Sequence, residues 1–169
     1  MSRQSHSEDL DDFDLKILAI LAEDGRVSWN ELAERIGLSQ TPTLRRVRAL
    51  ETSGYIAGYH ASIDERRVGR SISVYISVRL TTQTDESLAV FEARVARMPE
   101  VMSCFMMTGP FDYVLRAVVA DLDEYQRFVS SLTQIPGVSR ITSGFAVKRV
   151  VQRTVPPLPQ RSKAKRPST

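Results

Sequence analysis

The hydrophobic pattern of this 169-residue chain changes its period once, and that change limits the folds it can adopt. Up to about residue 54 the apolar residues recur at helical spacing, whereas over 71–80 every even-numbered residue is apolar and most odd-numbered ones are polar. Strict alternation is typical of a strand with one buried face. We therefore predict a helical domain over 10–63, a charged hinge linker over 64–70 and a sheet-containing domain over 71–152.

Residues that favour helix ends mark the first two predicted helices. Asp11 can cap the first helix, with Asp14 at its third helical position. Ser28 can cap the second one, because Ser-Trp-Asn-Glu has the pattern of a capping box. Gly37 is then expected to end the second helix, since glycine readily adopts the left-handed conformation of a helix C-terminus.

A third helix is predicted to follow after a three-residue turn, 37–39. Ser39 is its natural cap, and the apolar spacing continues to about Thr52. We expect residues 55–63 to form a short pair of strands that turns near Gly58, which would be the wing of a winged helix domain.

Two helices joined by a short glycine-containing turn are the signature of a helix-turn-helix, whose second helix enters the DNA major groove. The segment 37–50 carries three arginines and no acid, although 1–63 as a whole has seven Lys/Arg and ten Asp/Glu. A guanidinium donates two parallel hydrogen bonds to guanine or phosphate. An ordinary three-helix bundle with a solvated basic face is the alternative interpretation. The candidate DNA contacts are Ser39, Gln40, Thr41, Thr43, Arg45, Arg46 and Arg48.

The second domain is expected to contain a repeated β-α-β unit. Both of its predicted helices end in similar four-residue segments that contain proline, Met-Pro-Glu-Val at 98–101 and Ile-Pro-Gly-Val at 135–138, which lie 37 residues apart. This repeat favours an α+β, ferredoxin-like arrangement of four antiparallel strands with two helices on one face. The uncovered face would favour pairing of two copies. The strands are expected at 71–80, 101–108, 112–119 and 137–151.

Composition excludes several classes of protein. One cysteine and two histidines leave little material for a disulfide framework, a zinc site or a catalytic triad, so we expect no metal, no cofactor and no catalytic residue. No apolar run approaches the roughly 20 residues that span a bilayer, and no signal-like apolar core precedes Phe13, so we expect a cytoplasmic protein. Residues 1–9 and the basic tail 153–169 are expected to be disordered, the tail being a solvated extension or a non-specific DNA arm.

Several motifs in a fixed order resemble the Lrp/AsnC family of leucine-responsive, or feast/famine, transcriptional regulators. The resemblance spans about residues 10–152, and the ordered set is far more specific than any one motif. It implies a winged helix-turn-helix domain joined by a hinge to a ferredoxin-like effector domain. Members form homodimers through their sheets, often assemble to tetramers or octamers, and bind amino acids between subunits. The motifs include Asp24-Gly25-Arg26, Ile36-Gly37-Leu38-Ser39, Gly54-Tyr55-Ile56, Thr108-Gly109-Pro110-Phe111-Asp112-Tyr113 and Ile135-Pro136-Gly137-Val138.

The resemblance places the effector site in the loop between the second and third sheet strands. Backbone donors at Gly109 suit a carboxylate and Asp112 suits an ammonium group, so a zwitterion fits both ends. The family commonly has Asp directly after this glycine, where this chain has Pro110, which removes one backbone donor and one carboxylate. A plain turn is the alternative interpretation. The candidate effector residues are Met107, Thr108, Gly109, Phe111, Asp112 and Tyr113.

Together these features predict a nucleoid-associated regulator that binds double-stranded DNA, controls amino-acid metabolism or transport, and is not an enzyme. An effector-independent DNA-packaging protein is one alternative. Siroheme decarboxylases resemble the same two-domain plan and are the enzyme alternative. They are expected to use histidine around a tetrapyrrole in the second domain, and no histidine follows His60 here.

Overall fold

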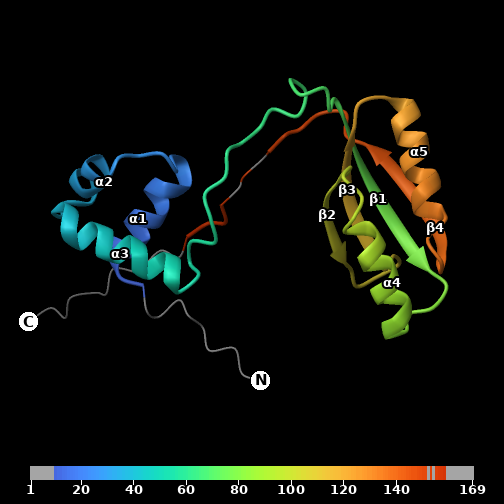
Figure 1. Cartoon of the computed structure of the whole chain (residues 1–169), viewed down its shortest axis with the longest axis horizontal. Helices are drawn as coiled ribbons and strands as arrows, with labels where there is room; N and C mark the ends of the chain where they lie inside the picture. Colours follow the sequence, from blue (N-terminus) through green and yellow to red (C-terminus); the bar gives the residue numbers. More distant parts are fainter. Residues whose placement is uncertain (1–9, 152, 154, 159–169) are drawn as a thin grey trace, which may run out of the picture. The chain divides into compact units, whose positions relative to one another are not determined.

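The structure is a computed structural model that describes residues 10–151, 153 and 155–158. The described chain divides after Ser62 and again before Val151 into two compact units, one helical and one built on a sheet (Figure 1). The expectations for 1–9 and for most of the tail lie outside the described residues. In chain order the elements are α1 (Asp12–Glu23), α2 (Trp29–Ile36), α3 (Gln40–Thr52), β1 (Ile72–Leu80), α4 (Asp85–Val95), β2 (Val101–Met106), β3 (Tyr113–Val119), α5 (Leu122–Thr133) and β4 (Val138–Phe145).

The predicted caps Asp11 and Ser28 hold the starts of α1 and α2, whereas Ser39, at the N-cap position of α3, makes no side-chain cap hydrogen bond. The Asp11 carboxylate accepts hydrogen bonds from the amides of Phe13 and Asp14, both at 2.9 Å, and the Asp14 carboxylate accepts one from the Asp11 amide at 3.1 Å. This reciprocal capping box satisfies amides that have no intrahelical acceptor. Ser28 caps α2 through its hydroxyl, and Gly37 ends that helix with a φ of 77°. The caps at Asp11, Ser28 and Gly37 were therefore predicted correctly.

The core of the helical unit lies where α1, α2 and α3 meet. Ile17 and Ile20 are the most deeply buried residues of α1, and the leucines of this helix pack partly buried around them. Both of the other helices contribute to the same cluster, through Leu32 of α2 and Val47 of α3 among others. Each such side chain contributes about 1.5–3 kcal/mol when fully buried.

The predicted pair of strands over 55–63 is wrong, because this segment contains a turn followed by irregular chain. Its start is tied to α3, since the Ile56 amide donates to the Leu50 carbonyl at 3.1 Å and the Tyr59 hydroxyl donates to Glu51 at 3.0 Å. An isolated two-stranded hairpin is marginal in water unless a third strand or a packed face supports it. The helical unit supplies no strand for this purpose among its described residues.

The second unit is a four-stranded antiparallel sheet in the order β2-β3-β1-β4 (Figure 1). Even-numbered residues of β1, such as Val74 and Ile76, are buried in one cluster with Phe91 of α4 and Phe128 of α5. Both helices therefore cover the same sheet face, and the ferredoxin-like expectation is confirmed. Strand β4 ends at Phe145 instead of running to residue 151, because its partner β1 begins only at Ile72 and the last ladder bond joins the Ala146 amide to the Ser73 carbonyl.

The other sheet face is open and partly apolar. Tyr75 of β1 is 50% exposed and Phe105 of β2 is 62% exposed, and Val114 lies directly opposite Phe105 in the β2–β3 pairing. Large exposed apolar side chains on one sheet face are typical of an interaction face.

The charged segment 64–70 forms a defined turn within the second unit. The Arg70 amide donates to the Glu65 carbonyl at 2.7 Å, and Gly69 has a φ of 79°, as at the end of a helical turn. Arg70 also pairs with Glu124 of α5. The predicted linker is thus fastened to the sheet unit by backbone and side-chain contacts.

Candidate nucleic-acid interface and ligand site

Helix α3 presents a basic row to solvent. Thr41, Arg45 and Arg48 are all exposed, and their i, i+4, i+7 spacing places them on one helix face. Neither arginine side chain has an ion pair or hydrogen bond within the described chain. Ser39 and Gln40 are exposed at the start of the same helix. The row therefore offers two uncommitted guanidinium groups on the solvent face of α3, and the N-terminus of the same helix, at Ser39 and Gln40, attracts anions.

Thr43 does not belong to this row. Its side chain is fully buried, and its hydroxyl donates to the Ser39 carbonyl at 2.9 Å. It shares the inward face of α3 with Val47 and Leu50. The prediction that Thr43 contacts DNA is therefore wrong, because the residue lies between the helices.

Arg46 is also committed within the protein. Its Nη1 lies 2.7 Å from the Asp11 carboxylate and 2.9 Å from that of Asp14, and its guanidinium lies 5.4 Å from the Phe13 ring centroid. The hydrogen bond to Asp14 raises the pKa of Arg46 above its ordinary value. This residue fastens α3 to the start of α1, so we remove it from the expected DNA contacts. Its position in the helical period, three residues after buried Thr43, is the signal that could have shown this.

The loop before β3 holds Asp112 in a structural role. Its carboxylate accepts the Leu80 amide at 2.6 Å and the Gln83 side-chain amide at 2.5 Å, and its own amide donates to the Val78 carbonyl at 2.9 Å. The residue is only 8% exposed. Both oxygens of Asp112 thus already have partners, one at the end of β1 and one at Gln83, and direct contact of Asp112 with the ammonium group of an effector stays a prediction.

Tyr113, the last expected effector residue, lies in the core. Its ring is 1% exposed and packs on Phe91 with centroids 4.5 Å apart. Its hydroxyl donates to Glu92 at 2.8 Å, and burial raises the pKa of that hydroxyl. Of the other candidates, Met107, Thr108 and Gly109 are exposed, and Gly109 has a φ of 127°, which favours glycine at the turn.

Two further properties of the described residues bear on function. They contain no group of three or more His, Cys, Asp or Glu that is placed to hold a metal ion. In the same part of the chain, no helix has the length and apolar character needed to cross a bilayer.

Comparison with known proteins identifies the family. Residues 10–57 match the family described as winged helix-turn-helix DNA-binding, and residues 73–156 match the Lrp/AsnC ligand binding domain. The Bkd operon transcriptional regulator of Pseudomonas aeruginosa is 56% identical over 151 residues, which cover 89% of this chain and 99% of the relative. This chain belongs to the Lrp/AsnC family. It is a DNA-binding transcriptional regulator with a ligand-binding domain.

Other Lrp/AsnC relatives show the same organisation along the whole chain. The proline dehydrogenase transcriptional activator of Rhizobium radiobacter is 37% identical over 155 residues, with 91% of this chain and 99% of the relative covered. Among solved structures, a transcriptional regulator from Neisseria meningitidis in complex with L-Met has a TM-score of 0.85 and 37% identity, covering 88% of this chain and 97% of that one. The helix-turn-helix and sheet units of this Lrp/AsnC protein thus match known regulators.

Proposed function

We propose that this Lrp/AsnC protein controls genes of amino-acid metabolism or transport, that it reads duplex DNA with the exposed row of α3, and that a small amino acid bound between subunits modulates it. The observation that carries the DNA-binding part is the row Thr41, Arg45 and Arg48, because its two guanidinium groups have no partner within the described chain. No step of this function is catalytic.

In this proposal α3 lies in the major groove, where Arg45 and Arg48 bind base edges or phosphates and Ser39 and Gln40 lie close to the backbone at the helix start. A homodimer places two such helices in successive major grooves. Tetramers or octamers of these dimers then engage several sites and bend the DNA between them.

The amino acid is proposed to bind at the exposed end of the 107–113 loop, beside Met107, Thr108 and Gly109. The relative from Neisseria meningitidis, whose structure is described as an L-Met complex, supports this class of ligand. Asp112 acts there by holding the loop against β1, and the neighbouring subunit completes the site. Such a ligand changes the affinity for DNA only if it binds one assembly state of the protein, such as the tetramer, more tightly than another, such as the octamer. The size of the change is set by the difference between those two ligand affinities.

The test begins with DNA selected by the wild-type protein from a random-sequence pool, followed by gel-shift titrations at several salt concentrations. We expect Arg45→Gln/Arg48→Gln to weaken binding at least tenfold. Each lost phosphate contact should lower the slope of log K against log salt by about 0.9. Arg127→Gln, an exposed arginine of α5, is the matched control and should bind as the wild type does. Unchanged affinity in the double variant would refute the proposed interface.

The same titrations are repeated with each of the twenty amino acids. At least one is expected to change the affinity or the number of shifted complexes, and the thermodynamic coupling of two ligands on one protein requires DNA to change that amino acid's affinity equally. If none has an effect, and calorimetry detects no binding of any of them, the protein acts as an effector-independent DNA-packaging protein.

A further inference from the structure

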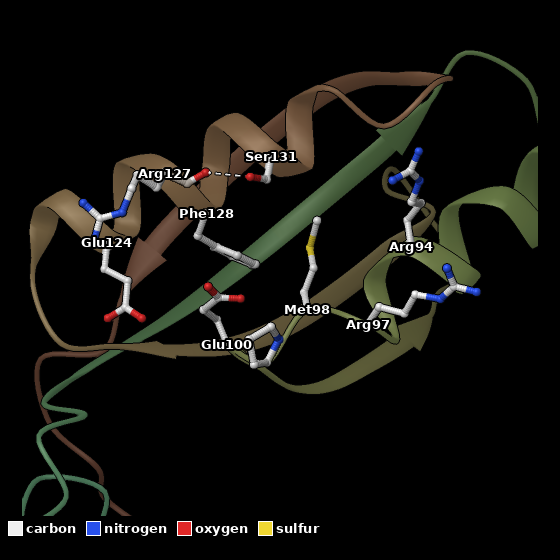
Figure 2. Close-up of a pocket in the computed structure, with 9 residues that line it drawn as sticks. Arg94, Arg97, Met98, Glu100, Glu124, Arg127, Phe128 and Ser131 are labelled. Carbon is white, nitrogen blue, oxygen red and sulfur yellow. Dashed lines mark hydrogen bonds between the residues drawn. The ribbon is translucent and has the colours of Figure 1, made fainter.

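A groove of about 520 Å³ lies on the helical side of the sheet unit, between the end of α4 with the loop that follows it and the face of α5 that carries Glu124, Arg127, Phe128 and Ser131. Figure 2 shows Met98 and Phe128 near its middle, with Arg94 and Arg97 on one side and Arg127 on the other. The groove shares no lining residue with the 107–113 loop. Its volume is within the range of small-molecule sites.

The charges around this groove are unbalanced. The side chains of Arg94, Arg97 and Arg127 have no ion pair or hydrogen bond in the part of the chain that the structure describes. Of the two acids that line the groove, Glu124 is already paired with Arg70 and accepts the Ala120 amide. The lining therefore carries three guanidinium groups against two carboxylates, a net charge of +1, and of these carboxylates only Glu100 has no arginine partner outside the groove among the described residues.

The floor between the charged groups is apolar. Phe128 is 3% exposed, so almost all of its ring lies in the core and only a small part reaches the groove, whereas half-buried Met98 and exposed Pro99 supply most of the apolar surface. A ligand that fits both features has an anionic end for the arginines and a short apolar chain for the floor. Arginine suits a carboxylate because it donates two parallel hydrogen bonds to its two oxygens.

We propose that this groove binds a small aliphatic carboxylate at a site separate from the amino-acid loop. The carboxylate contacts Arg97 or Arg127, and the hydrocarbon chain lies on Met98 and Pro99. Glu124 links the groove to the segment 64–70, which we call the connector. The Glu124 carboxylate both lines the groove and pairs with Arg70 of the connector, so a bound anion lies next to a group that fastens the connector.

Calorimetric titration of the full-length protein at low ionic strength tests this proposal with two matched probes. The first is 4-methylpentanoate, and the second is 4-methylpentan-1-ol, which has the same hydrocarbon chain without the charge. We expect saturable binding of the acid, at least tenfold weaker binding of the alcohol, and weaker binding of the acid at higher salt. Absence of acid binding, or equal binding of both probes, overturns the proposal.

Variants locate the site. Arg97→Gln/Arg127→Gln changes two exposed side chains and should leave folding intact, which thermal unfolding verifies. It should weaken 4-methylpentanoate binding at least tenfold, whereas Arg66→Gln, an exposed arginine of the connector, should not. Unchanged acid binding in the double variant places the anion elsewhere and refutes the groove. In gel shifts, the double variant should bind DNA as the wild type does. Failure of the groove proposal is therefore distinguishable from failure of the DNA-binding proposal.

Discussion

Three arginines within four positions of α3 have different environments because a helix completes a turn every 3.6 residues. Arg45 and Arg48 lie on the solvent side, while Arg46 faces the start of α1 and binds two carboxylates there. Identical side chains therefore differ in role: Arg46 ties two helices together, whereas Arg45 and Arg48 stay available for the proposed DNA contacts. Helical phase sets the direction of each side chain, and the neighbouring start of α1 supplies the carboxylates for Arg46.

Arg46→Ala is expected to destabilise the helical unit by about 1–3 kcal/mol, because it leaves Asp14 part-buried without its cation. Urea unfolding measures this, with Arg45→Ala as the control that should change stability by less than about 0.5 kcal/mol. Equal stability of the two variants would show that the Arg46 ion pairs contribute nothing to folding.

At the scale of elements, the connector 64–70 is held by a three-member ion cluster. The Glu65 carboxylate lies 2.6 Å from Arg116 of β3 and 2.9 Å from Arg149, and Arg116 also donates to the Ser73 hydroxyl at 3.1 Å. The hydrogen bond from Arg116 lowers the pKa of Glu65 below its ordinary value of 4.5. The charged form of Glu65 is therefore favoured in the folded protein.

Because its folded pKa is lowered, Glu65 stabilises the attached connector above pH 4.5, and this contribution is lost as the pH falls through the folded pKa. We expect the amide NMR signals of residues 67–70 to shift only below pH 4.5 in the wild type. In Glu65→Gln they should already have the acid-type positions at pH 7. Glu86→Gln, an exposed acid of α4, is the control and should titrate as the wild type does. Identical spectra of Glu65→Gln and wild type would contradict the role of the cluster.

For the whole molecule, the open sheet face is the expected surface of the homodimer. Tyr75 and Phe105 expose large apolar areas there, while the opposite face is covered by α4 and α5. An assembly that pairs these faces removes their apolar surface from water, which contributes about 25 cal/mol of stabilising free energy for each Å² buried.

Phe105→Lys is expected to weaken dimerisation at least tenfold, because it places a charge on the apolar surface that the paired faces would bury. Sedimentation equilibrium measures the change. Val90→Lys introduces the same charge at an exposed apolar position of α4 and should leave the dimer intact. A Phe105→Lys protein that dimerises with wild-type affinity would show that the subunits meet through another surface.

Local patterns in the sequence predicted much of this fold. Asp11 and Gly37 marked helix ends, and the alternation over 71–80 marked a strand with one buried face. Such signals act between residues that are close along the chain, so neighbouring residue types determine them. The ordered family motifs added the function, since they extend across both units.

Tertiary structure alone decided which candidate side chains are free. Arg46 bonds to Asp14, and Asp112 bonds to the Leu80 amide, each across 32 positions of the chain. Tyr113 lies in the core because it packs on Phe91 of α4, and the predicted strands over 55–63 do not form because the helical unit has no other strand among its described residues to pair with them. A polar side chain bonds to whichever partner the fold brings within hydrogen-bond distance. For residues far apart along the chain, that distance cannot be inferred from the sequence.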